Sequence, residues 1–560
     1  MSAWIAIVLF PFLQTPCGSP GPDLTIGDIA GVANFAASDG IEAVGFGISP
    51  TNVGSTWIDM FATTARHPVY GQSLYRLSTV GGATRIEEIG QSWLRHGFFA
   101  LSMGHFCTCT PTDGQHLGIG CDDSLSAALN SNPTALGPRW QVDAATGEFP
   151  FPAADPPHPG THDRRLRVAV ADLSASGGPD APRYFVEAQC VAPDDAAAGL
   201  GANDASHREV LVTGADPEWT FALTGTTQRE RPAIYAWKDA DPVVLVSEVL
   251  VPGDGRFLLA SRATDLGGGT WHYEYALLNQ SSDRSARTFR VPLPVGGSPT
   301  NPGFHDVAYH SGDGPGNVDF DGADWHFAAA PGEVSFSTSM YDENSSANAL
   351  RWSTTYNFRF DSTVPPGTGL ARVDLFKPGS PADVAVAAVV PFLVPPPPRN
   401  LCFGSGPGSG ACPCGNAGLP SAGCENSVHT GGALLATSGN PSLASDTLAF
   451  TASGELPTAL SLLLQGDVEI VPTPYGDGLR CVGGTLKRLY AGSATGGTIV
   501  LPGAGQPSVS ARSAARGDEI EAGETRLYQV YYRDPNPAWC PMPTGSTFNA
   551  THAVAIAWGS

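Results

Sequence analysis

Hydrophobic and polar residues alternate along much of this chain, in short runs that Gly, Pro, Asp and Asn residues separate. Between residues 232 and 393 these runs include VVLVSEVLV, TWHYEYALLN, EVSFSTSM, RWSTTYNFRF and LARVDLF. A period of two places successive side chains on opposite faces of a β-strand, and about seven or eight such strands indicate a β-sandwich. In 270–278 the pattern places Trp271, Tyr273 and Tyr275 on one face and His272, Glu274 and Ala276 on the other.

The stretch 23–230 has weaker patterns, and we expect a mostly β domain with few short helices. Ile86, Ile89, Trp93 and Leu94 recur at helical spacing, which predicts one short helix there. A second short helix is expected over 124–130. Strands are predicted over 166–173, 184–191 and 210–212.

A run of four prolines, Pro395 to Pro398, forms a stiff spacer near the last third of the chain. Strands are expected behind it over 447–452, 460–464, 468–471, 526–532 and 553–558. The predicted fold is all-β and multidomain. Its parts are a signal segment (1–22), a mostly β domain (23–230), a β-sandwich (231–394), the proline linker (395–398) and a disulfide-braced, cysteine-rich β module (399–560).

The apolar run AWIAIVLFPFL at 3–13 has the length of a signal-peptide core and is too short to span a bilayer. A basic segment before it is missing, because the first Lys or Arg is Arg66. Cys17 follows closely, but Gln14, Thr15 and Pro16 fit a lipoprotein signal poorly. No other run is long and apolar enough to predict a transmembrane segment.

Ten further cysteines fall into two even sets, as separate disulfide groups in two exported domains would require. Six cysteines allow fifteen connectivities, so the pairing stays open. The front set is Cys107, Cys109, Cys121 and Cys190, and the back set is Cys402, Cys412, Cys414, Cys424, Cys481 and Cys540.

The net charge of the chain bears on which macromolecules it can bind. The formal net charge is −23, and such a surface repels phosphate backbones, which argues against a nucleic-acid partner. The acidity either serves solubility or supplies carboxylates that capture calcium.

Two stretches contain candidate metal ligands. GHFCTCTPTDGQHLGIGCDD holds His105 and His116 among three cysteines, which form disulfides or bind zinc or copper. GNVDFDGAD matches the start of a calcium loop, although Ala328 stands where a Glu is expected. The candidate calcium ligands are Asn317, Asp319 and Asp321, with Asp324 or Asp313 in place of the missing Glu.

A group of histidines brackets that loop. His305, Asp306, His310 and His326 form a polar strand edge or a catalytic metal centre. The five-residue spacing in HDVAYH puts the two His on opposite faces of a strand, which disfavours a shared metal.

Several stretches mark a family resemblance. The back module carries CFGSGPGSGACPCGN, then GDGLRCVGG and YQVYYRD, and it resembles a C-terminal module of secreted proteins from planctomycete-type bacteria. The front part carries IGQSWLRHGFFALS, TDLGGGTWHYEYALLNQSSDRSAR and ANALRWSTTYNFRFD, and it resembles uncharacterised proteins of the same group. The resemblance implies export and a cell-surface or extracellular setting, without a particular activity.

These observations predict an exported cell-surface or extracellular protein that acts by binding or structural association. Exposed aromatic side chains on a sandwich suit contacts with a glycan or a protein. The alternative is a secreted metal-dependent hydrolase that uses the residues near His305 or His105. The chain has no H-E-x-x-H, G-x-S-x-G or P-loop pattern.

Overall fold

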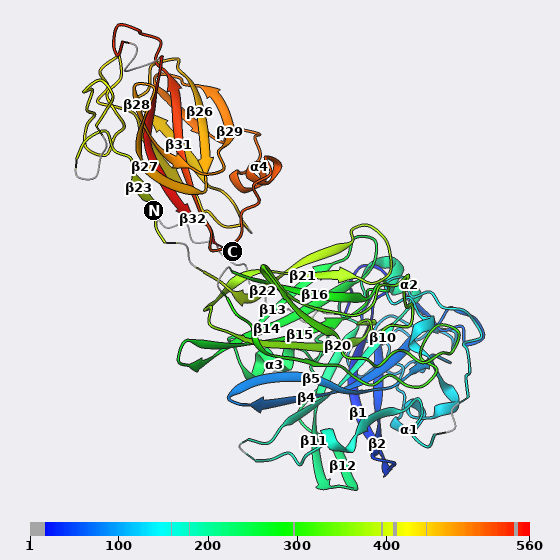
Figure 1. The fold of residues 1–560 in the computed structure, drawn as a ribbon. Helices are drawn as coiled ribbons and strands as arrows, with labels where there is room; N and C mark the ends of the chain where they lie inside the picture. Colours follow the sequence, from blue (N-terminus) through cyan, green and yellow to red (C-terminus); the bar gives the residue numbers. More distant parts are fainter. Residues whose placement is uncertain are drawn as a thin grey trace.

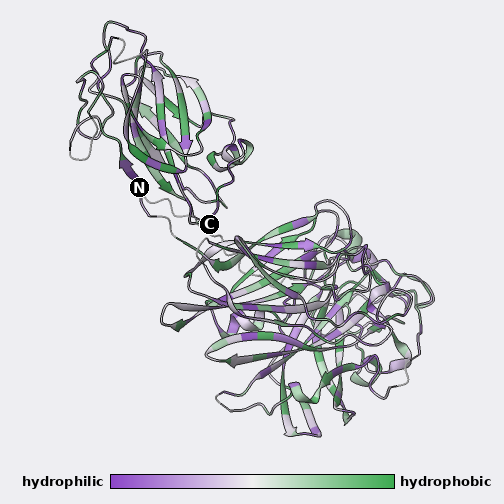
Figure 2. Cartoon of the chain, in the orientation of Figure 1, coloured by the Kyte–Doolittle hydropathy of each residue, from purple (hydrophilic) through white to green (hydrophobic). Residues whose placement is uncertain are grey.

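The computed structural model describes residues 17–157, 160–178, 180–294, 297–393, 396–406, 411–443, 445–541 and 547–559. These residues form β-sheets with four short helices, which confirms the all-β prediction. Strands alternate between hydrophilic and hydrophobic residues along their length (Figure 2). The helices are α1 (Ala127–Asn130), α2 (Pro193–Ala198), α3 (Tyr235–Ala240) and α4 (Val509–Ala515).

The first sheet gathers ten strands from the front of the chain. A central path of eight strands is extended by two short strands, of which one pairs with β4 and the other pairs with the first short strand. In spatial order the path is β1 (Leu24–Ser38), β2 (Ile41–Asn52), β9 (Leu166–Ala169), β5 (Ala83–Gln91), β4 (Val69–Val80), β10 (Arg183–Val191), β11 (Ala205–Ala215) and β12 (Glu218–Leu223), with β6 (Leu94–His96) and β8 (Leu136–Gly137) off it. A separate pair joins β3 (Ile58–Asp59) to β7 (His116–Leu117).

The next part of the chain forms two five-stranded sheets that pack face to face as a sandwich. Its core is rich in aromatic rings, among them Tyr273, Tyr275 and Phe358. One sheet is β13 (Leu245–Leu250), β14 (Arg256–Gly267), β15 (Thr270–Asn279), β20 (Thr354–Ser362) and β17 (Thr300–His305). The other is β18 (His326–Ala330), β19 (Gly332–Ser337), β16 (Ala286–Leu293), β21 (Pro366–Leu375) and β22 (Asp383–Pro391).

The predicted faces of β15 are confirmed. Tyr273 and Tyr275 lie in the sandwich core with Trp271 packed against it, whereas Ala276 belongs to a second core outside the sandwich. That second core, called here the junction core, packs the first sheet onto β14 and β15 through Tyr75, Leu77, Ile86, Phe185, Ala233, Ile234, Ala236, Trp237, Val244, Leu258, Ala260, Ala276 and Leu278.

Buried acids also form hydrogen bonds across this junction. The Glu88 carboxylate on β5 accepts a 2.6 Å hydrogen bond from the Thr355 backbone N–H of β20. The Glu187 carboxylate on β10 likewise accepts a 2.6 Å bond from the Ala233 N–H ahead of α3. The first sheet and the sandwich are therefore joined by one interface that contains both apolar and polar contacts.

The last third forms a smaller body, drawn yellow to red in Figure 1. Its core lies between a five-stranded and a three-stranded sheet, and a two-stranded ribbon packs beside them. The sheets are β23 (Arg399–Leu401), β32 (Phe548–Ala557), β31 (Thr525–Arg533), β26 (Leu460–Gly466) and β29 (Lys487–Ser493); β24 (Leu434–Ser438), β25 (Ala449–Ser453) and β30 (Thr498–Leu501); and β27 (Val468–Tyr475) with β28 (Gly478–Gly483).

The helix predicted around Ile86 and Trp93 is wrong, because this stretch forms β5 and β6. Both faces of β5 are buried: Ile86 lies in the junction core and Ile89 in the core of the first sheet. Burial on both faces removes the alternation of apolar and polar residues by which a strand is recognised. The helix predicted over 124–130 is present as α1.

The chain is already attached to the fold at Cys17. The Gly18 N–H donates to the Val53 carbonyl at 2.6 Å, and Ser19 forms a bridge with Gly54. The predicted signal segment 1–22 therefore overlaps the folded part by its last six residues, while residues 1–16 lie outside those described. Within the described residues, no helix has the length and apolar character that a membrane crossing requires.

Candidate functional site at the junction of two sheets

The cysteines separate into front and back groups, but the front pairing differs from the prediction. Cys17, which lies in the predicted signal segment, is joined to Cys107, and Cys109 is joined to Cys121. Cys190, expected in a disulfide, is a free buried thiol. Behind the linker, disulfides join Cys402 to Cys481, Cys412 to Cys424 and Cys414 to Cys540.

These disulfides remove the thiolate ligands from the first candidate metal site. The two histidines of that stretch also have other partners. His105 Nδ1 lies 3.0 Å from an Asp122 carboxylate oxygen, and His116 Nδ1 lies 2.8 Å from Asp113. A zinc or copper site built on thiolates is therefore incompatible with the observed pairing.

The candidate calcium loop lies at the surface, and its carboxylates hold local turns. Asp319 accepts 2.8 Å hydrogen bonds from the Ser311 hydroxyl and the Gly312 N–H. Asp321 accepts one from the Ala323 N–H at 3.0 Å. Asn317 has a positive φ of 62°, and Asp324 is exposed. Calcium binding at this loop stays a prediction.

The histidines near the loop do not form one centre. His310 is buried with both ring nitrogens occupied, since Nδ1 accepts from the Arg164 N–H at 3.1 Å and Nε2 lies 2.9 Å from the Gln91 carbonyl. His305 Nε2 lies 3.0 Å from the Glu88 carbonyl. Asp306 accepts a hydrogen bond from Asn348, and His326 is exposed on β18. In the part of the chain that is described, no group of three His, Cys, Asp or Glu has a metal-binding arrangement.

A pocket that sequence reasoning missed lies where the first sheet meets the sandwich. It encloses about 260 Å³, and we call it the junction pocket. Aromatic rings and charged groups line it together: Trp140, Tyr309, Phe320, Tyr341 and Trp352 with Arg139, Asp283, Asp313, Arg351 and Lys377. Ligand pockets are commonly apolar with a few placed polar groups and occur at domain interfaces.

Segments distant in sequence are fixed to one another at the pocket wall. The Arg139 guanidinium donates to the carbonyls of Ser92, Gln72 and Ser353, so one side chain ties the first sheet to the start of β20. In return the Trp352 indole N–H donates to the Arg139 carbonyl at 3.2 Å. These contacts hold the aromatic wall in place.

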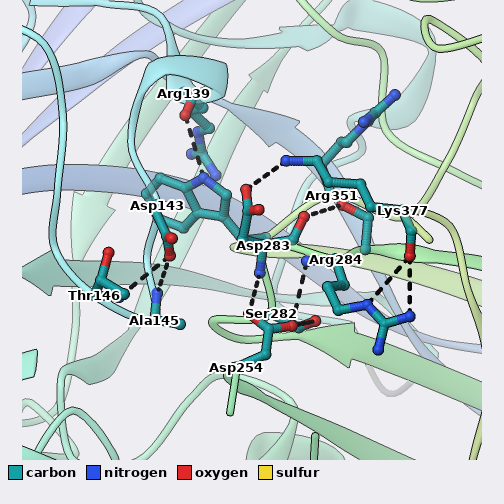
Figure 3. A network of polar contacts seen from close by, with 12 residues as sticks. Arg139, Asp143, Ala145, Thr146, Asp254, Ser282, Asp283, Arg284, Arg351 and Lys377 are labelled. Atoms are coloured by element: carbon teal, nitrogen blue, oxygen red, sulfur yellow. Dashed lines mark hydrogen bonds and ion pairs between the residues drawn. The ribbon is translucent and has the colours of Figure 1, made fainter. Parts of the chain in front are cut away.

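Figure 3 shows the polar wall, where Asp283 points toward the end of Lys377. Their charged atoms lie 2.6 Å apart, and both side chains are about one-third exposed. Asp254 accepts hydrogen bonds from the backbone N–H groups of Asp283 and Arg284 at 3.0 and 3.2 Å. The Arg284 guanidinium in turn donates to the Lys377 carbonyl at 3.0 and 3.1 Å. Hydrogen bonds to the backbone of Asp283 and of Lys377 therefore fix the position of this ion pair.

Asp313 has a different environment from Asp283. It is 1 % exposed, and neither carboxylate oxygen has a hydrogen bond of normal length and angle among the described residues. Burial raises the pKa of Asp313 to about 6, although the charge and the backbone N–H of Arg139 and the charges of Arg167 and Arg351 lower it. A buried carboxylate without a well-formed hydrogen bond is costly, which marks this position for a role other than stability.

Asp313 precedes the calcium-like motif by only a few residues, but the sequence carried no sign of the pocket. Its walls come from residues 139–142, 283–285, 309–320, 341–352 and 377, and only their packing brings them together. A scan against protein-family models finds no match for this chain, and a search of curated proteins finds no relative.

Proposed function

We propose that this protein is exported and that it binds a glycan in the junction pocket. Disulfides persist in oxidising compartments. Among the described residues, two disulfides lie before the proline linker and three lie after it. The more specific cell-surface setting depends on the resemblance of the back module and stays a prediction.

One observation carries the binding proposal: five aromatic rings surround a pocket that also holds a buried carboxylate without a well-formed hydrogen bond. The C–H faces of a sugar ring pack against aromatic rings, while its hydroxyls donate to carboxylates. A sugar therefore supplies both kinds of contact that this pocket leaves open. Trp140 and Tyr341 are two of the four lining rings that remain partly exposed; Trp352 is buried.

The experiment measures saccharide binding by calorimetry across a panel of neutral and acidic sugars. We expect Trp140→Ala and Tyr341→Ala to weaken binding by about tenfold or more, because truncating a central aromatic contact commonly costs that much. Trp57→Ala is the control, since Trp57 is 56 % exposed and lies outside the pocket. The proposal fails if no sugar binds, or if the pocket variants bind as tightly as the Trp57 control.

The alternative of a metal-dependent hydrolase has no comparable support. It depended on histidines near 305 and on the thiolates and histidines near 105. The ring nitrogens of His310 are occupied by backbone groups, and the cysteines near His105 are in disulfides. No observation in the described residues favours this function over binding.

A further inference from the structure

The junction pocket contains a second group whose bonding is incomplete. Arg351 lies between two aromatic rings, with its guanidinium carbon 4.3 Å from the Phe320 centroid and 4.8 Å from that of Phe376. Nη2 donates to the carbonyls of Ser345 and Ala347 at 3.2 and 3.1 Å, but the buried Nε has no acceptor. No carboxylate of the described residues lies within ion-pair distance of this guanidinium.

Each side-chain nitrogen of the other cations of the pocket has a partner. Each of the three Arg139 nitrogens donates to a carbonyl, and Lys377 is paired with Asp283. Arg351 and Asp313 therefore remain as one cation and one anion without an ion-pair partner among the described residues. The lining as a whole carries three basic and two acidic side chains, so it does not favour a cationic ligand.

We propose that the junction pocket takes an acidic sugar, a pyranose ring that carries a carboxylate. The carboxylate accepts charge-assisted hydrogen bonds from Arg351, and ring hydroxyls donate to Asp313. A neutral sugar would satisfy Asp313 but leave Arg351 without an anion. This inference rests on the proposed glycan-binding function and adds the chemical class of the glycan.

The size of the pocket limits how much of a glycan enters. Its volume of about 260 Å³ lies just below the usual range for sites that enclose a whole drug-sized ligand. One sugar ring fits this space, so the pocket receives a single acidic residue of a glycan.

The test uses D-galacturonic acid and D-galactose as probes, because they differ in one carboxylate. Calorimetry on the full-length protein should give affinity for galacturonic acid at least about tenfold above that for galactose. Arg351→Gln should abolish this preference. Arg372→Gln is the matched control, since Arg372 is a half-exposed strand residue paired with Asp383 outside the pocket.

A second variant covers the case in which Arg351→Gln fails to fold. Asp313→Asn keeps the shape of the side chain and should weaken both sugars by a similar factor, leaving the preference intact. Equal or tighter binding of galactose by the unmodified protein would overturn the acidic class and leave glycan binding in place. Failure of both sugars, and of every other saccharide in the panel, would overturn both proposals.

Discussion

Buried carboxyl groups next to the N-terminal strand make the stability of this protein depend on pH. Asp195 on α2 and Asp204 ahead of β11 are buried and contact each other, and Asp23 lies near both. Asp195 accepts a 2.8 Å hydrogen bond from the Leu24 N–H at the start of β1. Burial and the neighbouring carboxylates raise the pKa of Asp195 and Asp204, whereas Arg256 lowers that of Asp204.

The sign of the effect follows from proton binding. Above pH 4 an unfolded aspartate is ionised, whereas the folded pair still holds a proton, so stability falls as the pH rises toward 8. Asp195→Asn mimics the protonated form and should reduce this loss, by at most about 1.4 kcal/mol per pH unit. Urea unfolding at pH 5 and pH 8 measures it, with the exposed Asp342→Asn as control. If Asp195→Asn changes the free energy of unfolding equally at both pH values, the folded pair does not hold a proton between them.

The cysteines show how residue counting succeeded and failed. The six back cysteines close among themselves, as their even number suggested. The front set was also even only because Cys17 was assigned to the signal region. Cys17 instead pairs with Cys107, and Cys190 is left inside a core where burial raises the pKa of its thiol. Counting cannot distinguish a buried thiol from a bonded one.

At the scale of single elements, the sequence predicts best those strands that have one buried face. On β22 buried residues alternate with less buried ones, and its neighbour β21 behaves similarly. β5 is the exception, because it buries Glu87 and Glu88 beside its isoleucines. Charged residues inside a strand are stabilised here by partners from other elements, such as the Arg76 guanidinium 2.9 Å from Glu87. Such partners cannot be recognised before the fold is known.

Gly90 in β5 distinguishes the strand from the predicted helix by experiment. A Cβ atom at Gly90 would lie 2.3 Å from the Arg167 carbonyl of the neighbouring strand β9. Gly90→Ala should therefore destabilise the protein by about 1–3 kcal/mol. In a helix the same change would stabilise by about 1 kcal/mol.

The measurement is the free energy of unfolding from denaturant titration. Gly322→Ala serves as the control, because a Cβ there meets no atom within 4 Å and the backbone has no positive φ. A Gly90→Ala variant as stable as the unmodified protein, or more stable, would contradict the packing of β5 against β9.

At the scale of the whole molecule, the two boundaries differ in physical character. Across the one near residue 230, the junction core buries Trp237 and Tyr75, and the Tyr75 hydroxyl lies 3.1 Å from that of Thr355. Across the proline linker, the described residues form no disulfide, and their cores stay separate. The strand pattern predicts both boundaries, but only packing shows that the chain on either side of residue 230 shares an interface.

The junction pocket could not be predicted for the same reason. Asp313 and Arg351 are ordinary residues in loop-like stretches of the sequence, and Arg139 is more than a hundred residues away. Their proximity depends on the first sheet docking onto the sandwich, which is a property of the assembled front part. The sequence instead drew attention to residues with recognisable spacing, such as Asp319 and Asp321, which lie on the surface.

This difference between the boundaries predicts how the chain can be divided. A fragment from Arg399 onward should fold alone under oxidising conditions, because it closes its own three disulfides around its own core. The fragment 17–393 should also fold, with the junction pocket intact. The fragment 17–230 should not, since removing the sandwich exposes Tyr75, Ile86 and Phe185 of the junction core, each contributing about 1.5–3 kcal/mol when buried.

Calorimetric melting of the three fragments and of the full chain tests this division. We expect the full chain to show two transitions that match those of the fragments 399–560 and 17–393, because the described residues form separate cores before and after the proline linker. The fragment 17–230 should show no cooperative transition and should bind hydrophobic dyes. A cooperative melt of 17–230 would mean that the junction core is dispensable. A back fragment that unfolds when separated would mean instead that the linker conceals an interface, and that the module depends on the front part for its stability.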